Sequence, residues 1–238
     1  MSNLVNRFKH QIKSLWQTRI FIEIIRIQIK CGLDFVQIFE GKILAKLSMP
    51  THSQNPIRNR AETLHFVVRE LASKQNLLLL ETGCMRDDHG ELSWGDDGCS
   101  TLLFGLLAQS TKGRCVSVDI SPRAVRHARK YASKYNQLVV EDSVSFLSGF
   151  KHMNLVDLLY LDSFDFEAEN PLPSQEHHLR EIQACFDRLK SGALVLVDDA
   201  DTKFDGTFFG KATLVQEFFR QKGILPIIEG YQVLYQKP

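Results

Sequence analysis

Residues 77–105, "LLLLETGCMRDDHGELSWGDDGCSTLLFG", decide the fold of this chain. The first four are leucines bounded by polar residues, which is typical of a short strand buried on both faces of a parallel sheet. A helical pattern begins only at Ser100, after a long polar interruption. Turns that combine glycines with a free helix N-terminus are where α/β folds bind nucleotide-like ligands. An ordinary surface loop is the alternative interpretation of the interruption.

From residue 76 onward, short apolar runs alternate with helical patterns. We expect strands at 77–80, 115–119, 138–140, 156–161 and 193–197, and helices at 100–109, 121–135, 144–150, 174–189 and 211–222. This alternation predicts an α/β fold, a doubly wound and mostly parallel sheet with helices on both faces. The last segment, "ILPIIEGYQVLYQK", contains two strand-like runs that meet at Glu229 and Gly230. So short a connection requires an antiparallel hairpin at the C-terminus.

Size and composition limit the chain to one substantial core with a small appendage. It has 238 residues, of which 44% are hydrophobic. We expect a basic helical N-terminal extension over 1–59 and one α/β domain over 60–238. Five cysteines without a C-x-x-C pair indicate neither a disulfide framework nor a zinc site, which favours a cytoplasmic setting. An apolar run of about 18 residues and a signal peptide are both missing, so we expect a soluble protein.

Charge is distributed unevenly along the chain. Residues 1–60 contain ten Lys or Arg and three acids, whereas the remainder contains 19 Lys or Arg and 25 acids. A basic leader of this kind can contact phosphates, an anionic membrane surface or a partner. The segment 20–29, "IFIEIIRIQI", also supplies apolar positions that need covering. We therefore favour an amphipathic helical cap, with peripheral membrane contact as the alternative.

Acidic residues follow successive predicted strands. Asp119 ends the second strand, where a carboxylate can accept the ribose hydroxyls of an adenosine ligand or, alternatively, cap the next helix. Asp142 and Ser143 follow the third strand, where an adenine amino group would be received. Asp162 follows the fourth strand, and 198–199 is an acid pair after the fifth. Because the carboxyl ends of parallel strands form the ligand crevice, these acids predict a binding site along one edge.

Over residues 60–238 the sequence resembles the class I S-adenosylmethionine-dependent methyltransferases. The matching elements, in chain order, are Glu81-x-Gly83, Asp119, Asp142, Asp162 and the approach "LKSGAL" to the fifth strand. The resemblance implies a Rossmann-like fold and an S-adenosylmethionine cofactor. It assigns cofactor binding to Glu81, Gly83, Gly98, Ser100, Asp119, Asp142 and Ser143.

Asp162 together with Asp198 and Asp199 is similar to the divalent-metal triad of the catechol-type and macrocin-type O-methyltransferases within that family. Three hard oxygen ligands suit Mg²⁺, Mn²⁺ or Ca²⁺ better than zinc. One departure concerns Ala200, where many metal-dependent relatives have an aromatic residue. The resemblance therefore implies a divalent cation as a second cofactor, although the alanine at position 200 is a departure from the metal-dependent pattern.

A second departure is the insertion at 84–97, since family members usually have a compact glycine-rich turn after the first strand. Gly83 and Gly98 are separated here, and residues 98–101 are interpreted as the half of the turn that opens the helix. The insertion would then project a loop over the sulfonium, with His89 and Trp94 lining the acceptor pocket. An exposed irregular loop is the alternative.

Candidates for a general base lie after the fourth strand, in "DSFDFEAENPLPSQEHHLREI". Ser174 can cap the following helix, which would place His177 and His178 in its first turn, facing the same edge as Asp162. Histidine suits this role because its unperturbed pKa lies near physiological pH. Asp165 is the competing candidate, and Asp162 itself is a catalytic candidate through the metal.

The sequence thus predicts a methyltransferase that acts on a hydroxyl oxygen of a small-molecule or glycan acceptor, assisted by a divalent metal. One alternative is a nicotinamide-dependent oxidoreductase, disfavoured because G-x-G-x-x-G is missing. Another is a non-catalytic module that docks through its basic N-terminus, disfavoured by the clustered acids. We expect no nucleic-acid partner, and the sequence leaves the acceptor and a homo-oligomeric state open.

Overall fold

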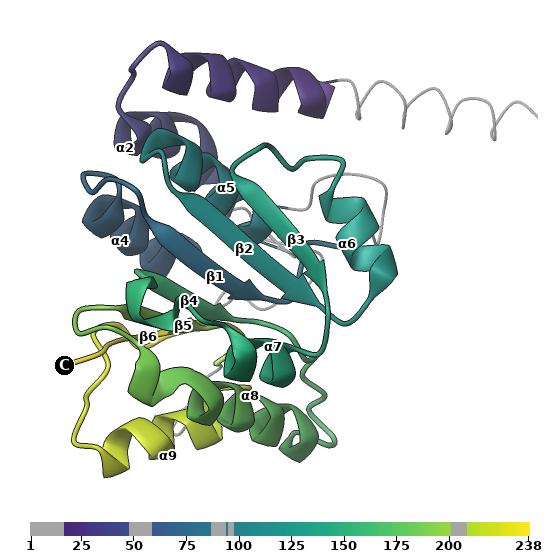
Figure 1. Ribbon diagram of the computed structural model, residues 1–238, viewed down its shortest axis with the longest axis vertical. Coiled ribbons are helices and arrows are strands. Elements are labelled where there is room, and N and C mark those ends of the chain that lie inside the picture. Colours follow the sequence, from purple (N-terminus) through teal and green to yellow (C-terminus); the bar gives the residue numbers. More distant parts are fainter. Residues whose placement is uncertain (1–16, 48–58, 87–93, 95–97, 201–208) are drawn as a thin grey trace, which may run out of the picture.

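Six strands form one sheet at the centre of the computed structural model, which describes residues 17–47, 59–86, 94, 98–200 and 209–238 (Figure 1). The strand order is β3-β2-β1-β4-β5-β6. The first five strands are parallel, and β6 pairs antiparallel with β5. Their bounds are β1 Leu78–Thr82, β2 Arg114–Asp119, β3 Asn136–Val140, β4 Leu158–Leu161, β5 Leu194–Val197 and β6 Val233–Gln236. The predicted fold class is confirmed.

The strands are apolar because helices cover both faces of the sheet. β4 ("LLYL") and β5 ("LVLV") are buried at every position. Neighbouring side chains of a strand point to opposite faces, so Leu79 lies in one hydrophobic cluster and Leu80 in the other. Continuous apolar strands of this kind are expected only in a sheet covered on both sides.

The predicted C-terminal hairpin is only partly present. β6 forms a full antiparallel ladder with β5, whereas the run before it contributes a single isolated bridge between Ile228 and Leu234. Pro226 lies in that run and cannot donate a backbone hydrogen bond to a ladder. The antiparallel strand is therefore confirmed, and the first arm of the hairpin is corrected to a bridge.

Helices are divided between the two faces of the sheet. On the first face lie α2 Phe35–Ile38, η1 Phe39–Ile43, α3 Leu44–Leu47, α4 Ala61–Leu71, α5 Ser100–Ser110 and α6 Pro122–Ala128. On the second lie α7 Ser143–Gly149, η2 Met153–Leu155, α8 Leu172–Cys185, η3 Phe186–Arg188 and α9 Thr213–Gln221. Every residue of α5 from Ser100 to Gln109 is buried, so this helix is the centre of the first layer.

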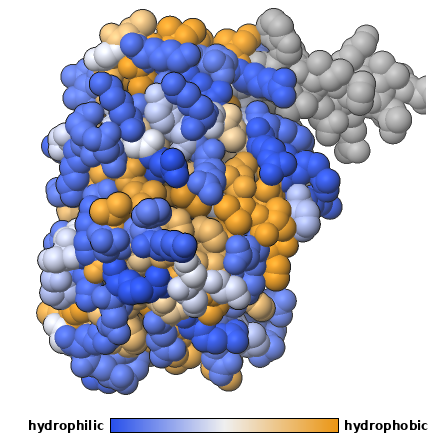
Figure 2. Space-filling view, in the orientation of Figure 1, coloured by the Kyte–Doolittle hydropathy of each residue, from blue (hydrophilic) through white to orange (hydrophobic). Residues whose placement is uncertain are grey.

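A helix over residues 17–30 lies along the outer side of the first layer (Figure 1). Its Ile22 and Ile25 are buried in the first cluster, and Gln109 donates a 3.1 Å hydrogen bond to the Arg26 carbonyl. A second side of the same helix exposes Ile20, Ile24 and Ile27, and apolar surface is visible at that end of the molecule in Figure 2. Among the described helices, none combines the length and the apolar character that crossing a membrane requires.

Candidate functional site

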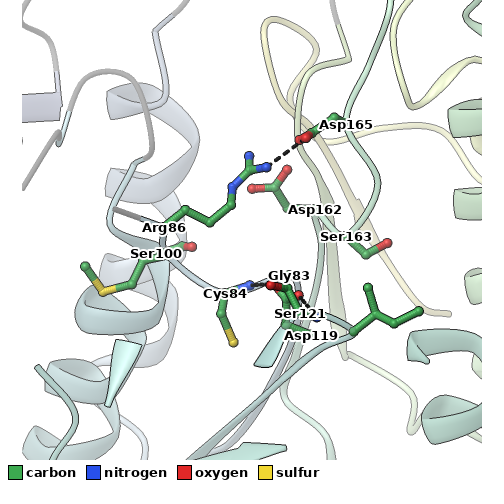
Figure 3. A pocket seen from close by; sticks show the side chains of 11 residues that line it. Gly83, Cys84, Arg86, Ser100, Asp119, Ser121, Asp162, Ser163 and Asp165 are labelled. Atoms are coloured by element: carbon green, nitrogen blue, oxygen red, sulfur yellow. Dashed lines mark hydrogen bonds and ion pairs between the residues drawn. The ribbon is translucent and has the colours of Figure 1, made fainter. Parts of the chain in front are cut away.

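A cleft of about 270 Å³ opens at the carboxyl ends of β1, β2 and β4 (Figure 3). It is lined by residues 83–86 after β1, Ser100 at the start of α5, residues 119–121 after β2, and residues 162, 163 and 165 after β4. β1 has β2 on one side and β4 on the other, so successive strands are added first to one side of β1 and then to the other. Such a switch point is where open α/β sheets bind their ligands.

Gly83 fixes the turn after β1. Its φ of 85° lies in the left-handed region, and a Cβ added there would be 2.3 Å from the carbonyl oxygen of Asp162. Its N–H donates a 2.8 Å hydrogen bond to the Val118 carbonyl. This position therefore excludes a side chain, because the turn packs directly against the backbone after β4.

Asp119 lines the cleft and holds the same turn. Its Oδ2 accepts a 2.8 Å hydrogen bond from the Cys84 N–H, and its Oδ1 accepts a 2.7 Å bond from the Ser121 N–H. Ser121, rather than Asp119, caps α6 by accepting from the Ala124 N–H. Each carboxylate oxygen has a second lone pair, so Asp119 can still accept hydrogen bonds from a ligand hydroxyl.

Glu81 and Ser100 link the end of β1 to the beginning of α5. The Ser100 hydroxyl donates to Glu81 Oε1, and Glu81 Oε2 is buried without a hydrogen-bond partner among the described residues. Burial raises the pKa of Glu81 to about 7, although the hydrogen bond from Ser100 opposes the shift. Ser100 lines the cleft, whereas Glu81 does not line it and contacts it through Ser100.

Of the described part of the insertion, residues 84–86 line the cleft, whereas Trp94 and the following Gly98 do not. Gly98 has a φ of 68°, and a Cβ added there would be 2.9 Å from Cδ of Arg60. It packs against this side chain and does not line the cleft. Trp94 is 7% exposed and belongs to the first hydrophobic cluster. Burial of its large ring in the core is favourable, so it does not line the acceptor pocket as predicted. His89 lies outside the described residues.

Asp142 and Ser143 do not line the cleft. Asp142 caps α7 by accepting a 2.9 Å hydrogen bond from the Ser145 N–H, which lowers its pKa. Ser143 Oγ lies 2.9 Å from His177 Nε2, in a contact between α7 and α8. The predicted cofactor role of both residues therefore has no support from the cleft lining.

The two histidines also lie away from the cleft. α8 begins at Leu172, two residues before the predicted cap Ser174, which moves His177 beyond the first turn. His178 is fully buried and its Nδ1 lies 2.7 Å from the Ser174 carbonyl oxygen. Burial lowers the pKa of His178 to about 4, so this imidazole is held neutral inside the second layer. The geometry gives neither histidine access to a ligand in the cleft.

Asp165 reaches the cleft but is already paired. Arg86, on the opposite wall, places Nη1 2.8 Å from Asp165 Oδ2 (Figure 3). Burial would raise the pKa of Asp165, but the Arg86 guanidinium outweighs this effect and lowers it. An aspartate with a lowered pKa is a weaker proton acceptor. The sequence interpretation did not include Arg86.

The predicted acid triad does come together. Carboxylate oxygens of Asp162, Asp198 and Asp199 lie within 4.8 Å of one another. Two cations that the sequence interpretation missed accompany them: Arg60 Nη2 lies 2.7 Å from Asp198, and Lys211 Nζ lies 2.5 Å from Asp162 and 3.0 Å from Asp199. Three clustered carboxylates would otherwise repel one another.

These contacts decide whether the triad fits a divalent ion. Carboxylate oxygens are suitable ligands for Mg²⁺, but Asp198 is fully buried and both its oxygens already accept hydrogen bonds from Arg60. The Lys211 ammonium bridges the other two acids. A divalent ion would have to displace this ammonium, so in this arrangement the donor set does not fit the ion.

Ionisation in the cluster follows from burial and from these pairs. Burial raises the pKa of Asp162 well above its ordinary value, and the Lys211 ammonium only partly opposes the shift. For Asp199 the balance is reversed: burial would raise its pKa, but Lys211 and Arg60 lower it. Burial alone would lower the pKa of Lys211, yet the carboxylates of Asp162 and Asp199 raise it above the ordinary value. Lys211 is therefore expected to stay protonated at neutral pH.

The fold and the cleft define a Rossmann-like α/β protein with a site for a nucleotide-like ligand. A family model described as "Methyltransferase domain" matches residues 93–200. Residues 93–200 are thus similar to a methyltransferase domain, in agreement with the resemblance to the class I, S-adenosylmethionine-dependent type that the sequence carries. A search of curated proteins gave no match.

Solved structures share this fold at low sequence identity. The MycE methyltransferase from the mycinamycin biosynthetic pathway, in complex with Mg, SAH and mycinamycin VI, is 15% identical with a TM-score of 0.53. The match covers 74% of this chain and 49% of that chain, so this chain spans about half the length of MycE. A second MycE crystal form with Mg and SAH gives 13% identity, a TM-score of 0.53, and coverages of 74% and 48%.

Proposed function

We propose that this chain transfers the methyl group of S-adenosylmethionine to a hydroxyl oxygen of a small-molecule or glycan acceptor. The observation that carries the proposal is the composition of the cleft, which combines Gly83, Ser100 and Asp119 of the cofactor turn with Asp162 from the neighbouring strand. A nucleoside bound by the first group would present its sulfonium towards the acid of β4. The methyltransferase-domain match over 93–200 supports the same reaction class.

The cofactor end of the cleft has suitable chemistry for adenosine. Asp119 would accept the ribose hydroxyls with its remaining lone pairs. Ile120 follows it, lines the cleft and is 71% exposed, which gives an apolar surface for one face of the adenine ring. The Arg86 guanidinium, 46% exposed on the cleft wall, offers a cation to the cofactor carboxylate. Each of these contacts is a proposal for this chain.

Methyl transfer to oxygen needs alignment and a proton acceptor. The acceptor oxygen attacks the methyl carbon in line with sulfur, a C–O bond forms, the C–S bond breaks and sulfur leaves as a neutral thioether. The hydroxyl proton passes to Asp162, whose carboxylate lines the cleft. Asp165 is paired with Arg86, and the histidines of α8 do not reach the cleft. Asp162 is also paired, with Lys211, but burial raises its pKa whereas Arg86 lowers the pKa of Asp165, so we choose Asp162 as the base.

Methyl transfer assisted by a divalent metal is the alternative mechanism. MycE was solved with Mg, and three acids converge here. The pairing of these acids with Arg60 and Lys211 argues against it. We therefore propose no catalytic step through a metal in this chain.

The test combines cofactor binding with turnover. We expect S-adenosylhomocysteine, but not NAD, to raise the melting temperature of the full chain. Radiolabelled S-adenosylmethionine with a panel of hydroxylated acceptors would then report methyl transfer. Asp162→Asn should bind S-adenosylhomocysteine within about threefold of wild type and lose about 10²–10⁴-fold in turnover. Asp165→Asn is the matched control in the same cleft and should lose far less. Stabilisation by NAD alone would reject the proposal.

A further inference from the structure

Cationic side chains of the protein contact the acidic cluster after β4 and β5. Lys211 Nζ lies 2.5 Å from Asp162 Oδ1 and 3.0 Å from Asp199 Oδ2. The third acid, Asp198, accepts hydrogen bonds from Arg60 Nε at 3.0 Å and from Arg60 Nη2 at 2.7 Å. Every acid of the triad therefore has a cationic partner from the protein itself.

Lys211 is built into this position by the backbone. Its side chain is 1% exposed, and its own N–H donates a 2.8 Å hydrogen bond to the Asp199 carbonyl. The preceding Gly210 packs so closely that an added Cβ would be 1.9 Å from the Asp199 carbonyl oxygen. The chain therefore approaches the edge of the sheet as closely as a glycine allows, and the ammonium is fixed between two carboxylates.

Asp198 is satisfied independently of any ion. Gln232 Nε2 donates a 2.7 Å hydrogen bond to its Oδ1, in addition to the two bonds from Arg60. The guanidinium is held in turn by Tyr231, whose hydroxyl lies 3.1 Å from Nη2 and whose ring lies under the cation. Asp198 thus has the partners of a buried structural carboxylate.

We propose that Lys211 is the resident cation of this cluster, so that the site operates without a divalent metal and Lys211 positions Asp162 in the cleft. An ammonium and a divalent ion both reduce the repulsion between neighbouring carboxylates. Mg²⁺ also requires six oxygen ligands in near-octahedral geometry, and two donors of the triad already bind the ammonium. The consequence for catalysis rests on the proposed function, whereas the metal preference does not.

The metal preference is measured on the full chain without an acceptor. We expect wild type to show no saturable binding of Mg²⁺, Mn²⁺ or Ca²⁺ by calorimetry up to about 1 mM, and no change in melting temperature with EDTA. Lys211→Met removes the ammonium and leaves three acids with Arg60 alone. This variant should melt at a lower temperature than wild type, and saturating Mg²⁺ should restore about 3–6 °C.

Lys190→Met is the matched control, because Lys190 pairs with Asp157 at 2.5 Å outside the cluster. It should show no recovery with Mg²⁺, which separates a metal site opened at the triad from a general effect of losing an ion pair. If Lys211→Met does not fold, the double variant Lys211→Met with Asp162→Asn removes one charge of each sign, and it should fold without responding to Mg²⁺.

Stoichiometric divalent-ion binding by wild type, or a fall in its melting temperature with EDTA, would overturn the proposal. So would a folded Lys211→Met variant that Mg²⁺ does not stabilise. Because none of these measurements uses S-adenosylmethionine or an acceptor, failure of the methyl-transfer proposal would leave their outcome unchanged.

Discussion

Asp119 has a structural role, and we propose that the same carboxylate binds the cofactor. It accepts two backbone hydrogen bonds and still faces the cleft. We expect Asp119→Ala to weaken S-adenosylhomocysteine binding by about 10- to 100-fold in titration calorimetry, because charge-assisted hydrogen bonds to the ribose are lost.

Asp157 provides the control for that variant. It also accepts a backbone hydrogen bond, 2.9 Å from the Leu78 N–H, but at the amino end of the sheet. Asp157→Ala should therefore destabilise the fold without changing the affinity. Equal affinity in a folded Asp119→Ala protein would remove Asp119 from the cofactor site.

Glu81 should make stability depend on pH. Burial raises its pKa from 4.5 to about 7 in the folded state. Between these values the unfolded chain has released a proton that the folded chain still binds, so stability falls as pH rises from about 4.5 to 7. The shift corresponds to about 3 kcal/mol.

Glu81→Gln stays neutral in both states, so the variant should lose this part of the pH dependence. Urea unfolding of wild type and variant at several pH values gives the difference directly. Parallel stability curves from pH 4.5 to 7.5 would show that Glu81 titrates normally in the fold.

Individual residues were predicted unevenly from the sequence. The acids after the strands could be placed because a strand end is a local pattern, and Asp119, Asp162 and Ser100 do meet in one cleft. Arg60 and Lys211 could not, because each is defined by a partner distant in sequence: Arg60 pairs with Asp198, 138 residues away. No periodicity or spacing marks such a pair.

Elements were predicted more securely than their ends. Strand positions followed from apolar runs, but the start of α8 was placed two residues late, at Ser174 instead of Leu172. The Ser174 hydroxyl donates to the Phe164 carbonyl rather than capping the helix. His177 therefore lies beyond the first turn of α8, and it contacts Ser143 of α7. The existence of this helix was therefore easier to predict than its first residue.

The helix over 17–30 allows a paired test of its covering role. Ile25 is fully buried, whereas its neighbour Ile24 is 44% exposed. Ile25→Ala should cost about 2–4 kcal/mol of unfolding free energy, because it leaves a cavity in the first cluster. Ile24→Ala should change stability by less than about 0.5 kcal/mol. Equal effects in urea unfolding would mean that the helix does not pack on the domain in solution.

At the scale of the whole molecule, the basic N-terminal region and the acidic remainder raise the question of a docking partner. The burial of Ile22 and Ile25 supports a covering role for this region. We therefore expect no salt-sensitive binding of the full chain to vesicles that contain anionic lipid, measured by co-sedimentation. Binding that weakens as salt rises from about 50 to 300 mM would instead show electrostatic membrane attachment through the leader.

The strand order has a consequence for how the cleft comes into existence during synthesis. β1 is the central strand, yet its two neighbours β2 and β4 begin at Arg114 and Leu158. The turn at Gly83 is closed by the backbone of Asp162, and the cation of the cluster comes later still, at Lys211. Contacts between such distant segments form slowly, and domains fold as units. A ribosome that has released only the first 150 residues therefore presents a half-built sheet, in which the turn at Gly83 lacks its packing partner and the cleft lacks its β4 side, so we expect cofactor binding to develop only late in synthesis.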